Sequence, residues 1–221
     1  MPDIQITKRH SFTGHTSGIF DLQTINDHQL LSAGGDGQIV MWDIKNPKDG
    51  QVIAKVNSTV YSILVDEDHL LVGENSRAIH LVRLSDKKPI RSMEIKSPIF
   101  AIERIGDSYY VGTGAGELFI FDLELNLEKK VRLAPKSLRS ISANDTDIAL
   151  AYSDNVIRII DRKTLAPKYE AKGHSLSVFS AKYHPKTNHL VSTGRDAKIK
   201  IWDTFNHYEE SQSIDAHMYA S

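Results

Sequence analysis

The stretch that decides the fold is Asp36-Gly37-Gln38-Ile39-Val40-Met41-Trp42-Asp43, and it returns near the end of the chain as Asp196-Ala197-Lys198-Ile199-Lys200-Ile201-Trp202-Asp203. Weaker copies end at Leu81-Val82-Arg83, Ile120-Phe121-Asp122 and Ile159-Ile160-Asp161. The five copies end at positions 43, 83, 122, 161 and 203, so the intervals between them are 40, 39, 39 and 42 residues. A period of this size predicts a repeat architecture in which each repeat is one small structural unit.

Within each period, apolar and polar residues alternate over short stretches that are bounded by turn-forming residues. The first period divides into four such stretches, at residues 19–25, 30–33, 38–44 and 51–56, and the second at residues 60–65, 69–72, 78–84 and 90–95. Each period therefore predicts a four-stranded antiparallel sheet. One such sheet cannot bury both of its faces alone, so the sheets must stack, and their radial arrangement is an all-β propeller.

Composition limits the class of protein further. The chain has 221 residues, of which 40% are hydrophobic and 25% charged, and its formal net charge is -1. A near-neutral chain has no global basic field, so we expect no nucleic-acid partner. With 0 Cys, disulfides, a thiolate nucleophile and Cys-ligated zinc are excluded. The apolar runs are too short to span a membrane, and residues 1–10 have no apolar segment typical of a secretory signal, so we expect a cytoplasmic protein.

The pairing of Gly14-His15 with Trp42-Asp43, and of Gly173-His174 with Trp202-Asp203, resembles the WD-repeat β-propeller family. This resemblance covers essentially the whole chain. It implies a structural tetrad of His, Ser, Asp and Trp, joined by hydrogen bonds, in the first and fifth repeats. By position, the two tetrads are His15, Ser32, Asp36 and Trp42, and His174, Ser192, Asp196 and Trp202.

The same slots in the three middle repeats hold mostly apolar residues. A buried polar network stabilises only when every member has its hydrogen-bond partners, so we expect the whole polar cluster to be replaced by packed apolar groups there. The slots hold Val56, Val72, Ser76 and Val82 in the second repeat, Ile95, Val111, Ala115 and Phe121 in the third, and Ala134, Leu150, Asp154 and Ile160 in the fourth.

The termini raise a question about closure of the ring. In the family that the chain resembles, the first strand completes the last blade, and residues 3–13 have the character of such an outer clasp strand. Residues 209–214 have the same character, so two strands compete for one place if the ring has five blades. We therefore expect a fragment of a larger, seven-bladed ring, with an open edge capable of self-association. The expected boundaries are blade 1 at 16–56, blade 2 at 57–96, blade 3 at 97–135, blade 4 at 136–172, blade 5 at 175–215 and the start of a further repeat at 216–221.

One column of residues, at the second position of each innermost strand, is rich in the types that dominate binding hot spots. Its members are Phe20, Tyr61, Phe100, Arg139 and Phe179. The resemblance implies that this column lies near the upper mouth of the channel, where peptides bind, and the alternative is that the rings only pack between blades. A second column, expected to face the same way, consists of Gly35, Asn75, Gly114, Ser153 and Arg195.

Several patterns that could indicate chemistry have simpler interpretations. The Ser, His and Asp of each tetrad could be mistaken for a hydrolytic triad, but no Gly-x-Ser-x-Gly motif surrounds either serine. His28, His69 and His189 fall in different repeats and are not expected to meet at one metal ion. The acids at 66–68 and the basic residues at 129–132 are expected to be solvated, in a turn and on an outermost strand respectively.

The sequence therefore predicts a non-catalytic scaffold that binds a protein or peptide across the channel mouth, with no cofactor and no metal. The column and Arg195 together suit a segment that carries an acidic residue beside an apolar or aromatic anchor. Two alternatives stay open at this point. One is a propeller enzyme such as a metal-dependent hydrolase or lactonase, and the other is a purely structural domain of a larger complex.

Overall fold

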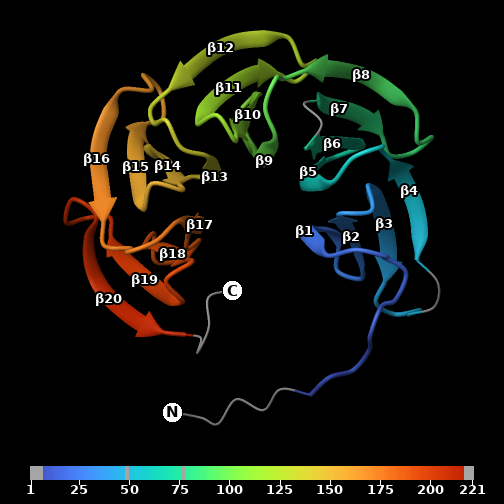
Figure 1. Cartoon of the computed structure of the whole chain (residues 1–221), viewed down its shortest axis with the longest axis horizontal. Helices are drawn as coiled ribbons and strands as arrows, with labels where there is room; N and C mark the ends of the chain where they lie inside the picture. The colour runs from blue at the N-terminus through green and yellow to red at the C-terminus, as the bar shows by residue number, and fades with distance from the viewer. Residues whose placement is uncertain (1–6, 48–49, 76–77, 217–221) are drawn as a thin grey trace.

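The computed structural model describes residues 7–47, 50–75 and 78–216. Within these residues the chain forms twenty β-strands, which make five four-stranded antiparallel sheets, as Figure 1 shows. In every sheet the four strands are neighbours in the order in which they follow one another along the chain. The prediction of an all-β propeller architecture built from four-stranded blades is confirmed.

We call the five sheets blades 1 to 5. Blade 1 consists of β1 (Ile19–Asn26), β2 (Gln29–Gly34), β3 (Gln38–Asp43) and β4 (Gln51–Lys55). Blade 2 consists of β5 (Val60–Asp66), β6 (His69–Glu74), β7 (Ala78–Arg83) and β8 (Pro89–Glu94). Blade 3 consists of β9 (Ile99–Ile105), β10 (Ser108–Thr113), β11 (Glu117–Asp122) and β12 (Leu127–Arg132). Blade 4 consists of β13 (Leu138–Ala143), β14 (Asp147–Tyr152), β15 (Val156–Asp161) and β16 (Pro167–Lys172). Blade 5 consists of β17 (Val178–Tyr183), β18 (Leu190–Gly194), β19 (Lys198–Asp203) and β20 (Glu209–Asp215).

The core consists of four apolar clusters, and each cluster joins two neighbouring blades. Leu31 and Ile39 of blade 1, for example, pack with Ile63 and Leu70 of blade 2, and all four are completely buried. The two central strands of a blade therefore need apolar residues on both faces, because one face packs on the preceding blade and the other on the following blade.

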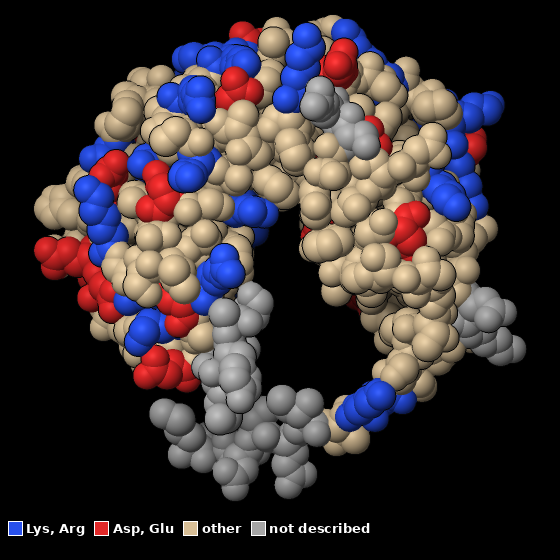
Figure 2. Space-filling model, viewed as in Figure 1, with Lys and Arg blue, Asp and Glu red and all other residues tan. Residues whose placement is uncertain are grey.

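The outermost strands, β4, β8, β12, β16 and β20, consist mostly of exposed residues. The basic stretch that the sequence predicts to be solvated lies on β12, where five of six residues are exposed and Lys130 pairs with Glu117 at 2.7 Å. Figure 2 shows Lys and Arg side chains along this outer margin. Charges on an outer strand discourage edge-to-edge pairing with another chain.

In blades 1 and 5, hydrogen bonds join the four side chains of each predicted tetrad. The Trp202 Nε1–H donates to Ser192 Oγ over 2.8 Å, and Ser192 Oγ lies 2.8 Å from His174 Nε2. His174 Nδ1 lies 2.9 Å from the Asp196 carboxylate, which can only accept. The acceptor at one end and the indole donor at the other require that Nδ1 carries the proton and that the Ser192 hydroxyl donates to Nε2. The tetrad of blade 1 has the same geometry, with distances of 2.7, 2.6 and 3.0 Å.

Removal of one member of a tetrad should leave buried partners without hydrogen bonds. We expect His174→Ala to lower the free energy of unfolding by about 1–3 kcal/mol. The reciprocal change Ala134→His in blade 4 should give no stabilisation, because its partners Leu150 and Ile160 can neither donate nor accept. Denaturant titrations measure both effects, and an unchanged midpoint for His174→Ala would contradict the energetic role of the tetrad.

The tetrad of blade 1 should also make stability depend on pH. Burial raises the pKa of Asp36, but hydrogen bonds from the Thr16 N–H, His15 and the Gln38 N–H outweigh it and hold the pKa at about 2, below the usual 3.8. Because this folded-state pKa is lowered, the stability that the ionised carboxylate contributes is present above about pH 4 and is lost as the pH falls towards 2. The difference in unfolding free energy between the wild type and Asp36→Asn should therefore shrink over this range. A difference that stays constant from pH 4 to pH 2 would contradict this assignment.

The middle blades differ from one another in how they fill the tetrad slots. In blades 3 and 4 the apolar replacements are packed, with Phe121 and Ile160 each 1% exposed. In blade 2 the expectation of a packed apolar replacement is incomplete, because Val56, Val72 and Val82 line a cavity of about 470 Å³. Three valines have less volume than the residues of the polar tetrads, so space remains. Ser76 lies outside the described residues.

The described residues form an open ring. No apolar cluster among them joins blade 5 to blade 1, and Figure 1 shows the two blades apart. The outer place in blade 5 is filled by β20, which pairs with β19 from Lys198 to Asp203. Of the expected clasp strand at residues 3–13, the described residues 7–13 form no strand, and Phe12 packs on Trp42 at 5.3 Å between ring centroids. Residues 3–6, and residues 217–221 of the expected further repeat, lie outside the described residues.

The opening between blades 5 and 1 therefore exposes a face of the blade 1 sheet. On this face, Ile19 and Leu22 are 51% and 60% exposed, beside a cavity of about 560 Å³ over Trp42. Exposed apolar surface of this kind favours association. We expect the 221-residue chain to self-associate as its concentration rises, and Leu22→Lys to reduce this. Light scattering measures the effect, and a chain that stays monomeric at all concentrations would contradict it.

Candidate functional site

The first strands of the blades, β1, β5, β9, β13 and β17, lie side by side around the central opening. Each of them contains a β-bulge near its start, because the register shifts by one residue between Ile19 and Asp21 and at the equivalent point in every other blade. The residue without a partner at the bulge is in each case the member of the predicted column. These residues are Phe20, Tyr61, Phe100, Arg139 and Phe179. A bulge changes the direction of a side chain, which here brings the column to the opening.

The second column follows an equally regular pattern. Each member donates its backbone N–H to the carbonyl that lies two residues before the bulge, over 2.8–2.9 Å. Two of its members, Gly35 and Gly114, lie directly against the rings. A Cβ atom on Gly114 would lie 3.2 Å from the Phe100 ring, and one on Gly35 would lie 3.5 Å from the Phe20 ring. Glycine at position 114 therefore leaves room for the Phe100 ring, whereas at position 35 a Cβ atom would clash first with Ser17 Oγ.

Four members of the first column contact one another and form what we call the ladder: Phe20, Tyr61, Phe100 and Arg139. The rings of Phe20 and Tyr61 meet edge to face with centroids 4.9 Å apart, and those of Tyr61 and Phe100 are 5.0 Å apart. The Arg139 guanidinium lies over the Phe100 ring, 4.0 Å from its centroid. Both ring distances are typical of favourable aromatic pairs, and the last contact is a cation–π interaction.

Arg139 has a polar partner in the second column as well. Its Nε–H donates to Ser153 Oγ over 3.0 Å, which orients the plane of the guanidinium. Burial lowers the pKa of Arg139, but an arginine stays protonated at neutral pH. Among the described residues, no carboxylate forms an ion pair with Arg139. Its remaining N–H groups are therefore available to a ligand.

All five members of the first column line two adjoining cavities at the opening, of about 530 and 350 Å³. The acids of the smaller cavity are already engaged. Glu103 pairs with Lys182 at 2.6 Å. Asp21 accepts the Ile63 N–H over 2.8 Å, and burial raises its pKa. In Figure 2, Lys and Arg side chains reach the opening on the side of β13 and β17.

Other predicted candidates do not join this site. Arg195 is exposed, and it lines neither cavity. Ser32 and Ser192 are each 1% exposed and bound to an indole, so neither is placed to act as a nucleophile. Within the described residues, no three His, Asp or Glu side chains are grouped so as to hold a metal ion. Nor do the described residues contain a helix that could cross a membrane.

Comparison with known proteins agrees with this geometry. The family model described as "WD domain, G-beta repeat" matches residues 6–43 and 165–203. The first and fifth repeats of the chain are therefore WD repeats. Both matched segments end in Trp-Asp and contain the residues of a tetrad, which explains why these two of the five repeats are the ones recognised.

The chain as a whole is similar to parts of larger proteins. It is 22% identical over 213 residues to Transducin beta-like protein 3 of Rattus norvegicus, with 86% of this chain and 26% of the relative covered. It is 23% identical over 225 residues to WD repeat-containing protein 44 of Xenopus laevis, covering 92% and 24%. It is 22% identical over 200 residues to Cell division control protein 4 of Saccharomyces cerevisiae, covering 88% and 24%. The chain thus spans about a quarter of the length of these relatives.

Three features were not predicted from the sequence: the bulges, the partners of Arg139 and the ion pair between Glu103 and Lys182. A signal for the bulges is present, since each first strand begins with two consecutive large residues that break the alternation, such as Ile19-Phe20 and Val60-Tyr61. No signal in the sequence pairs Glu103 with Lys182, because their 79-residue separation is bridged only by the curvature of the ring.

Proposed function

We propose that this chain is a non-catalytic scaffold that binds a peptide segment across the ladder. The observation that carries the proposal is the Arg139 guanidinium, which is stacked on Phe100 and has no carboxylate partner among the described residues. WD-repeat relatives are typically protein-interaction scaffolds, and this supports the same general role.

The chemistry of the ladder favours a segment with an acidic residue next to an aromatic or apolar residue. A guanidinium can bind a carboxylate through two parallel N–H donors. The neighbouring rings exclude water from that pair and strengthen it. Phe20, 53% exposed, offers apolar area beside them for the second side chain. The mutual ring contacts hold the ladder in place before binding, so little side-chain entropy is lost.

Substitutions in the ladder should weaken binding, whereas one on the outer strand should not. Phe100→Ala and Arg139→Ala should each cost about 1–3 kcal/mol of binding free energy, and Lys129→Ala should cost little. Arg139→Lys is the matched control, because it keeps the charge but loses the planar fork and should recover only part of the affinity.

The ligand for this measurement can be selected from a random peptide library on the immobilised wild-type chain. Selected peptides should combine an acidic residue with an adjacent aromatic or apolar residue, and calorimetric titration should then give the affinities of the four variants. Peptides that bind Phe100→Ala and Arg139→Ala as tightly as the wild type would show that the binding surface lies elsewhere.

A further inference from the structure

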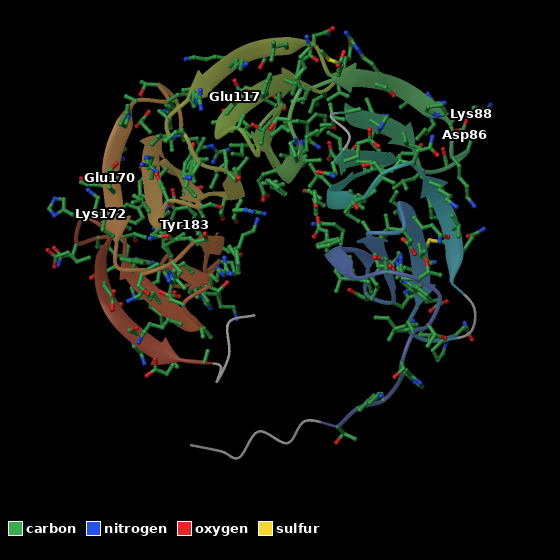
Figure 3. All side chains as sticks on the ribbon, viewed as in Figure 1. Asp86, Lys88, Glu117, Glu170, Lys172 and Tyr183 are labelled. Carbon is green, nitrogen blue, oxygen red and sulfur yellow. The ribbon has the colours of Figure 1, made fainter. Side chains whose placement is uncertain are left out.

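The cavity at the tetrad slots of blade 2 lies on the outer side of the ring, away from the channel. It lies between β4 of blade 1 and the strands of blade 2, and its volume is about 470 Å³. Its rim includes Lys87, which lies in the turn between Asp86 and Lys88, both of which are labelled in Figure 3. This volume is within the range of sites that bind small molecules.

The cavity has its origin in the loss of the tetrad from blade 2. Leu30 pairs with Trp42 in blade 1, and at the equivalent place in blade 2 Leu70 pairs with Val82. Trp42 places an indole in its slot and is 4% exposed, whereas the much smaller side chain of Val82 lines the cavity. The cavity therefore includes the space that an indole side chain would occupy in blade 2. Its apolar walls are formed by Ile53, Val56, Val72, Val82 and Pro89.

Two polar side chains on the same wall distinguish this cavity from a mere packing gap. Glu74 is only 7% exposed, and no described residue donates a hydrogen bond to its carboxylate. The Nε2 atom of His80 is fully buried and also has no hydrogen-bond partner among the described residues. These two groups are 3.8 Å apart, which is too far for a hydrogen bond between them.

The other nitrogen of His80 is held in place, because Nδ1 lies 2.8 Å from Ser92 Oγ. The ring is therefore oriented with Nε2 towards Glu74. Among the described residues, His80 Nε2 is a buried ring nitrogen without a hydrogen-bond partner, which is costly, and a ligand that bonds to it and to the neighbouring Glu74 carboxylate would be bound favourably.

We propose that this cavity binds a small, neutral, flat heteroaromatic molecule with an N–H donor. Its N–H would donate to the Glu74 carboxylate, its ring would pack against the valines, and a second ring nitrogen could accept from His80 Nε2. The exposed lysines at the rim, Lys55 and Lys87, disfavour a cationic ligand, which is why the proposal specifies a neutral one. The site is independent of the ladder and of the proposed peptide-binding function.

Benzimidazole is a suitable probe, because it has one N–H donor and one acceptor nitrogen on a flat ring system. We expect saturable binding to the whole chain in calorimetry near neutral pH, with 1-methylbenzimidazole, which lacks the N–H, at least about tenfold weaker. Glu74→Gln should weaken benzimidazole binding by a similar factor. Val82→Trp should abolish it by filling the cavity with the residue that blade 1 has in this slot.

Phe100→Ala, in the ladder, is the control variant and should bind benzimidazole as the wild type does. Circular dichroism establishes whether Val82→Trp is folded, and if it is not, Glu74→Gln and the methylated probe decide. The proposal is overturned if the wild type shows no saturable binding, if the methylated probe binds equally well, or if Glu74→Gln has no effect.

Discussion

Every blade of this protein has two apolar faces, and the need to cover both determines the rest of the structure. The four apolar clusters each cross from one blade to the next, so no blade is stable as an isolated unit. Stacking of twisted sheets around an axis brings the five first strands together at the opening. The position of the first column is thus a consequence of core packing: side chains from residues about 40 positions apart meet because their blades stack.

Within this arrangement, the polar tetrads and the apolar slots are two solutions to the same packing problem. Blades 1 and 5 keep the complete hydrogen-bonded network, and blades 3 and 4 fill the space with large apolar side chains such as Phe121. Blade 2 has neither the network nor enough volume, and it is there that His80 Nε2 lies without a hydrogen-bond partner among the described residues, 3.8 Å from the Glu74 carboxylate. A repeat that loses a buried network without refilling the space gains a cavity, and a cavity with polar walls is a candidate ligand site.

Much of the fold could be predicted from the sequence, because the 40-residue period and the alternation within it are strong local signals. The membership of the column could also be predicted, since one repeat can be aligned on another. The contacts within the ladder could not, because they depend on bulges that re-aim Phe20, Tyr61, Phe100 and Arg139. Residues 7–13 have the sequence character of an outer strand but form no strand in the structure, while β20 fills the outer place of blade 5 as expected. The cavity in blade 2 also escaped prediction, because the sequence showed valines at the slots but not the space between them.

The central claim is that Arg139, held on Phe100, binds a carboxylate of a peptide. A double-mutant cycle tests it most directly, combining Arg139→Ala in the protein with replacement of the acidic residue of a selected peptide by its amide. If the two groups interact, the coupling energy should be about 1 kcal/mol or more, because the pair is shielded from water by the neighbouring rings. Effects that add within about 0.3–0.5 kcal/mol would contradict the claim, since independent groups behave in that way.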